Sequence, residues 1–533
     1  MRRRLHDLLT ASAERAPESC AVVFQGQQTS YAEMEAASTR LARTLRSCGC
    51  QRGDRVALLL PKSTRALIAM FGTLKADCIY VPMDTGSPAA RLVRILRSCE
   101  SKFVLAVQST RALLAEIAKE DGLGGARVGW LDDGCEWGGE SAFSWGDVSQ
   151  QPASPVDTLN TEADPVHILF TSGSTGQPKG VVITHSNVLH FLDWAIPYFG
   201  MDSSDRISGH PPLHFDLSTF DVYGTVAAGA QIHLVQKELS VLPHRLADFI
   251  RDAQLTQWFS VPSILHHMAK FDAVRSNDFP ALKRVLWCGE KFPTPALRHW
   301  MSRLPKVQFF NLYGPTEATI ASSYYHVPCC PGSDTAEIPI GDACGGERLL
   351  VLNDELAPVE RGATGDLYIG GVGLSPGYWR DPEKTRQSFV QDPANPGEQI
   401  YKTGDLARRG EDGAIYLIGR ADSQIKSRGY RIELGEIEAA LQAVPGLQEA
   451  AVVAVDGSGF EGTEICCAYV TSRGHELSPM ALKKDLARVL PPYMIPAHWL
   501  ALENMPRNGN GKTDRPRLRE QFRHQSEGAA NVA

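Results

Sequence analysis

The feature that most constrains the fold is a regular alternation, up to about residue 310, of short apolar runs with longer segments of mixed polarity. Unbroken apolar runs of this kind are typical of strands buried on both faces, and the segments between them are long enough for crossover helices. The pattern therefore predicts parallel sheets covered by helices. The runs are Val56–Leu60, Ile79–Val81, Phe103–Leu105, Val166–Phe170, Gln231–Val235 and Val285–Trp287.

The rest of the chain has different sequence patterns. From about residue 335, short alternating runs are broken by Gly and Asp-Gly, as in Gly365–Gly370, and this predicts antiparallel hairpins. Residues 421–533 change again, with a helix expected over 433–443 and a strand over 449–455. We therefore expect a large domain over residues 1–420 and a separate, small α+β domain over residues 421–533.

The composition excludes several classes of function. The 533 residues carry 54 Lys and Arg against 61 Asp and Glu, and this net charge of −7 is unlike the basic field of a dedicated nucleic-acid-binding protein. No run approaches the ~18 apolar residues of a membrane helix, and His6 and Asp7 interrupt the region where a signal peptide would be apolar. The 12 cysteines lack the CxxC pairs of a zinc site. We expect a cytoplasmic protein with reduced cysteines and with no nucleic-acid or membrane partner.

The sharpest local signal is a loop rich in glycine and hydroxyl groups between two apolar runs. Backbone N–H groups can converge on an anion where glycines leave room, hydroxyls add donors and the lysine adds a cation, so the loop is a candidate polyphosphate site. It is not a Walker loop, because Pro178 stands where glycine should precede Lys179. An ordinary Gly/Ser-rich turn is the alternative. The loop comprises Thr171, Ser172, Gly173, Ser174, Thr175, Gly176, Gln177, Pro178, Lys179 and Gly180.

This loop resembles that of the acyl-adenylate-forming superfamily, and the whole chain resembles an adenylation domain of the non-ribosomal peptide synthetase type. The departures are Asp77, where a small glycine is usual, and Ser375-Pro376 in place of Ala-Arg. The resemblance implies an α/β fold in which a large N-terminal domain holds two helix-covered parallel sheets and a distorted antiparallel barrel, followed by a small mobile α+β domain. The other matching motifs, in order, are Leu74–Asp84, His214–Ser218, Asn311–Glu317, Gly365–Gly373, Tyr401–Leu406, Gly419–Glu433 and Asn508–Arg515.

The resemblance implies that ATP activates a carboxylate as an acyl-adenylate with release of pyrophosphate. The loop residues Thr171, Ser172, Thr175 and Lys179 would hold the β- and γ-phosphates. Because an anion attacks a polyanion, the site must supply positive charge and hydrogen-bond donors. The remaining implied roles are Mg²⁺ binding by Glu317, α-phosphate binding by Thr316, adenine stacking by Tyr313, ribose binding by Asp405 and Arg420, and a bridge from Lys512 to the substrate carboxylate and α-phosphate. Taken singly, each acid or lysine would be read as a solvated surface residue.

Asp216 bears on the class of substrate. In amino-acid-activating members of the family, an Asp at this motif position pairs with the α-ammonium group, and a buried carboxylate needs such a cation. Asp221 is an alternative partner if the substrate is a β-amino acid. His214 matches the family's gate beside the substrate carboxylate, and an ordinary core histidine is the rival interpretation.

The positions that match the family's side-chain pocket predict a small neutral substrate. None is charged, so a charged side chain would be left unpaired, and the large apolar residues narrow the space. We expect L-alanine, with glycine, serine and 2-aminobutyrate as neighbours, since one methylene changes discrimination by only ~1–3 kcal/mol. The positions, beside Asp216 and Lys512, are Leu217, Phe220, Ser263, Leu286, Cys288, Leu312, Ile320 and Ala321.

A second half-reaction is implied, in which the acyl group passes to a phosphopantetheine thiol. The family rotates its small domain about a hinge, here Asp422, which withdraws Lys512 and presents Lys426–Tyr430 to the site, with Gly429 leaving room for a narrow arm. No carrier module occurs in the chain, so we expect a free-standing enzyme that loads a separate carrier protein or an aminoacyl group on one. The alternatives are a D-alanine–carrier ligase of cell-wall type, an acyl-CoA ligase for a non-amino acid, and a non-catalytic relative.

Overall fold

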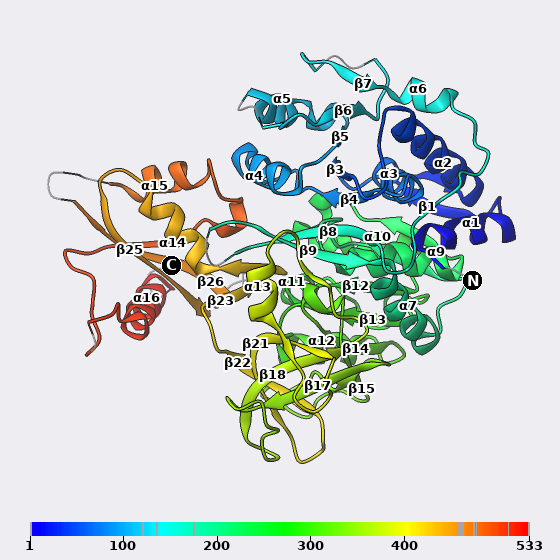
Figure 1. Ribbon diagram of the computed structural model, residues 1–533. Helices are drawn as coiled ribbons and strands as arrows, with labels where there is room; N and C mark the ends of the chain where they lie inside the picture. The colour runs from blue at the N-terminus through cyan, green and yellow to red at the C-terminus, as the bar shows by residue number, and fades with distance from the viewer. Residues whose placement is uncertain are drawn as a thin grey trace.

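The computed structural model describes residues 3–119, 122–134, 137–173, 176–456, 463–472, 475, 477–509 and 511–530. Two large sheets, one smaller antiparallel sheet and a C-terminal part make up the structure (Figure 1). The predicted α/β architecture is confirmed.

The first large sheet has eight strands in the order β19-β9-β8-β4-β3-β5-β6-β7 and is mainly parallel. The apolar runs predicted around residues 56, 79, 103 and 166 form four of these strands. The strands are β3 (Arg55–Leu59), β4 (Ile79–Pro82), β5 (Phe103–Ala106), β6 (Arg127–Trp130), β7 (Ser141–Phe143), β8 (Pro165–Thr171), β9 (Lys179–Thr184) and β19 (Gly377–Tyr378).

The second large sheet has nine strands in the order β16-β15-β14-β13-β12-β10-β11-β1-β2. Its central strands are parallel, so the carboxyl ends of β12, β13 and β14 lie along one edge. The strands are β1 (Cys20–Phe24), β2 (Gln27–Ser30), β10 (Arg206–Gly209), β11 (Gln231–Leu234), β12 (Gln257–Ser260), β13 (Arg284–Trp287), β14 (Gln308–Tyr313), β15 (Ser323–Val327) and β16 (Asp342–Ala343).

Helices cover both large sheets, because alternate side chains of each strand point to opposite faces. In β3, Val56 and Leu58 join the central core between the sheets, whereas Ala57 and Leu59 join the outer core under α4 and α5. The helices before residue 420 are α1 (Leu5–Arg15), α2 (Tyr31–Ser47), α3 (Thr64–Lys75), α4 (Ala89–Cys99), α5 (Arg111–Lys119), α6 (Trp145–Gln150), α7 (His185–Phe199), α8 (Leu217–Thr219), α9 (Thr225–Ala228), α10 (Pro243–Asp252), α11 (Pro262–Lys270), α12 (Thr294–Arg303) and α13 (Pro382–Ser388). Short 3₁₀ or π turns are η1 (Gln108–Thr110), η2 (Phe220–Gly224), η3 (Lys237–Val241) and η4 (Thr316–Ala318).

The predicted hairpins form a five-stranded antiparallel sheet, which lies at the bottom of Figure 1. Its strand β21 pairs with three neighbours and carries the motif that contains Asp405. The strands are β17 (Glu347–Leu352), β18 (Thr364–Gly371), β20 (Phe389–Gln391), β21 (Gln399–Arg409) and β22 (Ile415–Arg420).

The C-terminal part has its own sheets and cores and extends to one side of the larger part (Figure 1). Helices α14 and α15 pack on one face of its three-stranded sheet and α16 on the other. The predicted boundary after residue 420 and the predicted mobility stay predictions. The elements of the C-terminal part are β23 (Gln424–Ser427), β24 (Tyr430–Glu433), α14 (Leu434–Gln442), β25 (Leu447–Asp456), β26 (Thr463–Thr471), α15 (Pro479–Leu486), η5 (Pro492–Met494), β27 (His498–Ala501) and α16 (Arg515–Ala530).

Asp77, a departure from the family pattern, has a structural explanation. Its backbone has a φ of 61°, the left-handed region that favours glycine and that Asp tolerates better than most residues. Its carboxylate accepts hydrogen bonds from the backbone N–H groups of Leu159 and Asn160 and pairs with Arg46 at 2.9 Å. Asp77 therefore ties a loop to the end of α3.

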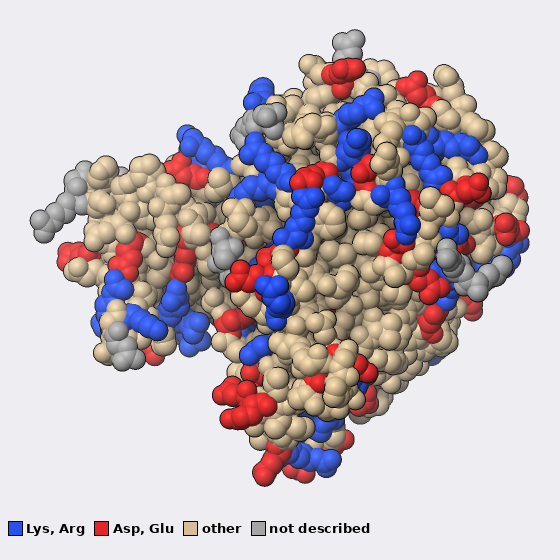
Figure 2. Space-filling view, viewed as in Figure 1, with Lys and Arg blue, Asp and Glu red and all other residues tan. Residues whose placement is uncertain are grey.

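Basic and acidic side chains are interspersed over the face shown in Figure 2, with acidic groups gathered at its lower end, where the five-stranded sheet lies. Within the described residues, the structure contains no helix that is both long enough and apolar enough to span a membrane.

Candidate active site

A cavity of about 950 Å³, including the part open to solvent, lies where the carboxyl ends of β8, β12, β13 and β14 meet the C-terminal part. Ligands in α/β folds bind at such strand ends. The predicted site residues that line it are Thr171, Ser172, His214, Asp216, Leu217, Cys288, Thr316, Asp405 and Arg420. The structure thus brings together residues that are up to 249 positions apart, from Thr171 to Arg420.

Asp216 lies half-buried on the wall of this cavity, next to the short helix α8. Burial raises the pKa of its carboxyl group to about 6, although hydrogen bonds from Thr316 and from the Leu217 N–H act in the opposite direction. A carboxylate whose ionised form is disfavoured gains most from a cationic ligand. The geometry is therefore suited to an ammonium group.

Glu317 is almost fully buried at 1% exposure and is ion-paired with Arg431. The Nη1 atom of Arg431 lies 2.7 Å from Oε2 and 3.0 Å from Oε1, and the Tyr378 hydroxyl donates to Oε1 at 2.6 Å. Burial acts to raise the pKa of Glu317, but Arg431 and Tyr378 bring it below its usual value. The ionised carboxylate is thus favoured, and Arg431 is the cation that balances it in this arrangement.

Glu317 also fits the predicted role in Mg²⁺ binding. Mg²⁺ is commonly held by one or two carboxylates, with substrate phosphates and waters completing its shell. Within the described residues, no group of three or more His, Cys, Asp or Glu side chains could hold a metal ion by itself. Any Mg²⁺ here would therefore depend on phosphate oxygens and water for the rest of its ligands.

The described part of the phosphate loop contacts the C-terminal part. The Ser172 hydroxyl donates to the Arg431 carbonyl oxygen at 2.6 Å, and the Gly173 N–H donates to Oε2 of Glu436 at 3.3 Å. Lys179 lies on β9 with its Nζ 4.0 Å from Oε1 of Glu433. Acceptors of the C-terminal part thus occupy donors that are predicted to hold phosphate.

Two positions of the loop require glycine. A Cβ atom on Gly173 would lie 2.0 Å from the carbonyl oxygen of Gln177, and Gly176 has a φ of 79°. Ser174 and Thr175 lie outside the described residues. Arg91 of α4 forms a buried ion pair with Glu436, which fixes the carboxylate that meets Gly173.

The predicted nucleotide residues Tyr313, Asp405 and Arg420 are already linked to one another. The Tyr313 hydroxyl donates to Oδ2 of Asp405 at 2.5 Å, and Nη1 of Arg420 donates to Oδ1 at 2.9 Å. Lys426 places its Nζ 5.5 Å from the centroid of the Tyr313 ring, in a cation–π contact. Arg420 also pairs with the predicted hinge residue Asp422, with Nη2 and Oδ2 2.6 Å apart.

The predicted side-chain pocket is mostly closed. Leu217 and Cys288 line the cavity, whereas Ser263 lies on α11 and donates its N–H to Glu290 at 3.1 Å. The others are packed together in the central core, at most 2% exposed. They are Phe220, Leu286, Leu312, Ile320 and Ala321.

His214 and Asp221 differ in their relation to the cavity. His214 lines it, and burial lowers the pKa of the imidazole while Asp84 opposes this shift. Asp221 does not line it, and burial raises the pKa of its carboxyl group well above the usual value. Both carboxylate oxygens of Asp221 lack a hydrogen-bond partner among the described residues. The structure therefore does not bring the alternative amine partner to the cavity.

Lys512 lies away from the cavity in an exposed turn, where its N–H donates to Oδ1 of Asn508 at 3.1 Å. The segment predicted to replace it is present instead, since Lys426, Gly429 and Tyr430 line the cavity. Gly429 has a φ of 81° and donates its N–H to Oε1 of Glu290 at 2.7 Å. This is the arrangement expected for the second half-reaction, and the role of Lys512 in the first stays a prediction.

Comparison with known proteins supports the resemblance found in the sequence. The model of the family described as "AMP-binding enzyme" matches residues 9–379, and that of the "AMP-binding enzyme C-terminal domain" matches residues 436–512. The chain belongs to the AMP-binding enzyme family. This AMP-binding enzyme is 37% identical, over 92% of its length and 91% of the relative's, to an L-proline--[L-prolyl-carrier protein] ligase of Streptomyces coelicolor.

Other relatives are much longer. The chain is 34% identical over 99% of its length to surfactin synthase subunit 2 of Bacillus subtilis, but it spans only 14% of that protein. It spans 45% of tyrocidine synthase 1 of Brevibacillus parabrevis. Among solved structures, IdnL1 shares 29% identity with a TM-score of 0.76, covering 94% of this chain and 99% of that one. The Vibrio cholerae adenylation domain AlmE has the same fold, with a TM-score of 0.85 at 24% identity over 98% of each chain.

Sequence reasoning missed three charged residues of this AMP-binding enzyme's site, Arg91, Arg431 and Glu436. Arg431 lies inside a matched motif, so its charge within an otherwise predicted nucleotide site was an available signal. Arg91 is one of several arginines on an amphipathic helix, and nothing in the sequence distinguishes it. Glu436 lies in the first turn of α14, where an acidic residue ordinarily favours the helix dipole.

Proposed function

We propose that this AMP-binding enzyme uses ATP to activate a small uncharged amino acid as an aminoacyl-adenylate and then transfers it to the phosphopantetheine thiol of a carrier protein. The single observation that carries the proposal is Asp216, a half-buried carboxylate of raised pKa facing a cavity that also holds Thr316 and Asp405. A substrate without an amine would leave this carboxylate uncompensated.

The first half-reaction needs a carboxylate oxygen to attack the α-phosphorus while the bond to pyrophosphate breaks. Asp216 would orient the substrate by its ammonium group, and Thr316 would donate to the α-phosphate. Mg²⁺, when held by Glu317 together with phosphate oxygens, supplies positive charge that lowers the repulsion between the reacting anions. Lys512 would complete the positive surroundings of the α-phosphate after rotation of the small domain.

The second half-reaction needs a narrow path for the thiol. A Cβ atom on Gly429 would lie 2.5 Å from Cγ1 of Val261, so the backbone passes close to the wall at this point. Tyr430 and Tyr493 stack with ring centroids 3.6 Å apart and also line the cavity. These groups would guide the slender, uncharged pantetheine end of the arm to the acyl carbon, where the thiol sulfur replaces AMP.

The closed pocket favours a small side chain, and L-alanine is our first choice. L-proline is the second candidate, because two relatives, at 37% and 35% identity, are named L-proline--[L-prolyl-carrier protein] ligases. The test is ATP–pyrophosphate exchange with L-alanine, glycine, L-proline, D-alanine, β-alanine and propanoate. A stronger response to L-alanine than to the other acids supports the proposal. A strongest response to L-proline would replace L-alanine by L-proline as the proposed substrate. A response to propanoate alone overturns the role of Asp216.

A further inference from the structure

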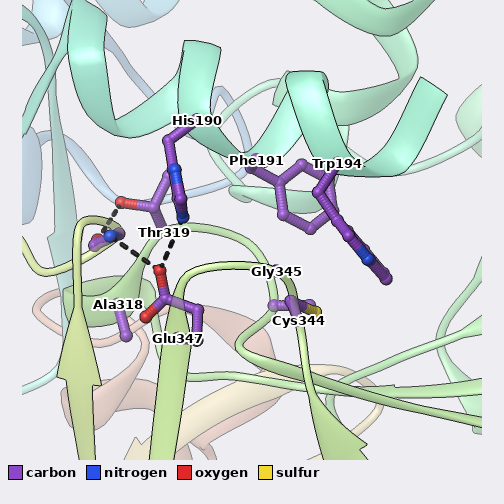
Figure 3. Close-up of a pocket in the computed structure, with 10 residues that line it drawn as sticks. His190, Phe191, Trp194, Ala318, Thr319, Cys344, Gly345 and Glu347 are labelled. Carbon is purple, nitrogen blue, oxygen red and sulfur yellow. Dashed lines mark hydrogen bonds and ion pairs between the residues drawn. The ribbon is translucent and has the colours of Figure 1, made fainter. Parts of the chain in front are cut away.

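A small hollow lies behind the loop that carries Thr316 and Glu317, outside the cavity described above. It contains an ion pair that the proposed chemistry does not use. Figure 3 shows His190 on one side of the hollow and Glu347 on the other, joined by a dashed line. The Nε2 atom of His190, on α7, is 3.2 Å from Oε1 of Glu347, at the start of β17.

The carboxylate of this pair is buried, whereas the His190 side chain is 22% exposed. The Glu347 side chain is 3% exposed, and its Oε2 atom has no hydrogen-bond partner among the described residues. The adjoining Glu347 carboxylate raises the pKa of His190, which favours the imidazolium form. A buried carboxylate of this kind is held in place by its partners and cannot swing freely to water.

Glycines let the backbone approach both members of the pair. A Cβ atom would lie 2.4 Å from Cε1 of His190 if Gly346 carried one, and 2.6 Å from Oε2 of Glu347 if Gly371 did. A Cβ atom on Gly373 would lie 2.8 Å from Oε1 of Glu347. Real Cβ atoms essentially never make contacts shorter than 3 Å, so a side chain at any of these positions would displace His190 or Glu347.

From this pair, hydrogen bonds lead directly to the active-site loop. The Gly373 N–H donates to Oε1 of Glu347 at 2.8 Å, and the Thr319 hydroxyl donates to the Gly373 carbonyl oxygen at 2.7 Å. Figure 3 shows Thr319 and Glu347 joined through these contacts. Every link is buried or nearly so, which makes each hydrogen bond expensive to lose.

Thr319 and Ile320, the residues at the end of this chain of contacts, have a strained backbone. Their φ angles are 56° and 69°, in the left-handed region, although both residues are β-branched. Such conformations persist only where the surrounding structure fixes them. The turn carries Ile320 and Ala321, which belong to the predicted side-chain pocket and lie three and four residues after Glu317.

We propose that His190 and Glu347 are positioning residues that, through Gly373 and Thr319, hold the left-handed turn at Thr319–Ile320 and thereby fix the wall of the amino-acid pocket. This inference rests on the proposed function for its substrate and on the geometry above for its mechanism. Glu347 touches neither substrate nor nucleotide, because it does not line the active-site cavity. It acts through the turn.

The first test measures KM values in ATP–pyrophosphate exchange. Thr319→Val removes the hydroxyl and keeps the shape, so the KM for the amino acid should rise about tenfold, the effect of one lost buried hydrogen bond, with the KM for ATP unchanged within about twofold. Thr319→Ser should restore the wild-type KM. Glu347→Leu should resemble Thr319→Val, and Glu347→Gln, which keeps an acceptor for the Gly373 N–H, should have a smaller effect.

The matched control is Thr294→Val. Thr294 is also buried and donates its hydroxyl to a backbone carbonyl, that of Ala336, at 2.7 Å, and this hydrogen bond is not among the contacts that reach the turn. The Thr294→Val variant should lose a similar free energy of unfolding, with the KM values for the amino acid and for ATP both unchanged. Equal increases in the KM values for ATP and amino acid in Thr319→Val, or no increase in either, would overturn the proposal.

The second test requires no substrate. Hydrogen exchange of the backbone amides over residues 316–323 should be faster in Thr319→Val and Glu347→Leu than in the wild type and in Thr294→Val. Unchanged exchange there overturns the positioning role. If the wild type shows no exchange of pyrophosphate with any acid, the proposed function fails, and the amide measurement still decides whether Glu347 and Thr319 hold the turn.

Discussion

Replacing Arg431 by methionine should separate the two half-reactions. In the structure, Arg431 is the ion-pair partner of Glu317, whose side chain is 1% exposed. Removing one member of a buried pair costs about 3–5 kcal/mol, because the remaining charge is left uncompensated. We take the lower figure, since Glu317 keeps the hydrogen bond from Tyr378.

A cost of about 3 kcal/mol would lower the population of the domain arrangement seen here by roughly 100-fold relative to the other arrangement. Because this arrangement is the one that withdraws Lys512, Arg431→Met should slow transfer to a carrier thiol by about that factor. Adenylate formation, in which we propose that Glu317 holds Mg²⁺ without Arg431, should be nearly unchanged. The assay is ATP–pyrophosphate exchange in parallel with single-turnover transfer from a preformed aminoacyl-adenylate.

The control is Arg515→Met, which breaks an ion pair with Glu438 at 2.8 Å that lies wholly within the C-terminal part. That variant should leave both half-reactions close to wild type. Parallel loss of both activities in Arg431→Met would refute the reasoning, as would undiminished transfer.

Three further outcomes follow from the structure. The Asp216 carboxyl group has a pKa raised to about 6, so it is protonated below that pH, and the KM for the amino acid should rise as the pH falls from 7 to 5; the rise should be absent in Asp216→Asn. Phe220→Ala removes a fully buried ring, which should lower the free energy of unfolding by about 3–5 kcal/mol in a denaturant titration and admit larger amino acids in the exchange assay. Gly429→Ala places a methyl group 2.5 Å from Val261 and should impair thiol transfer while sparing adenylation, whereas Gly413→Ala, with a similar φ of 84° but nothing within 4 Å, should affect neither.

The main features of the fold could be predicted because they depend on local patterns. The apolar runs at 56, 79, 103 and 166 became strands, since each has about the length of one strand and lies between longer segments of mixed polarity. The alternation of Val56 and Ala57 between two cores could not be read from the sequence, because both residues are apolar. That assignment depends on which helices cover each face.

The site was predictable where a residue's chemistry fits a motif and obscure where a contact is made at long range. Asp216 and Thr316 lie on one cavity, as the motifs suggest. The pair of Arg91 with Glu436 joins positions 345 residues apart, and no local pattern encodes it. The turn at Thr319 was equally hidden, because β-branched residues rarely adopt its conformation and only tertiary contacts hold them there.

The assignment of Asp216 to the substrate ammonium group is the central claim, and the most direct test compares L-alanine with propanoate in ATP–pyrophosphate exchange by wild type and Asp216→Asn. The account predicts that the wild type uses alanine and scarcely uses propanoate, and that the variant raises the KM for alanine by roughly 100-fold, the cost of unpairing a partly buried charge, with the KM for ATP unchanged. An unchanged KM for alanine in the variant, or equal use of the two acids by the wild type, would contradict it.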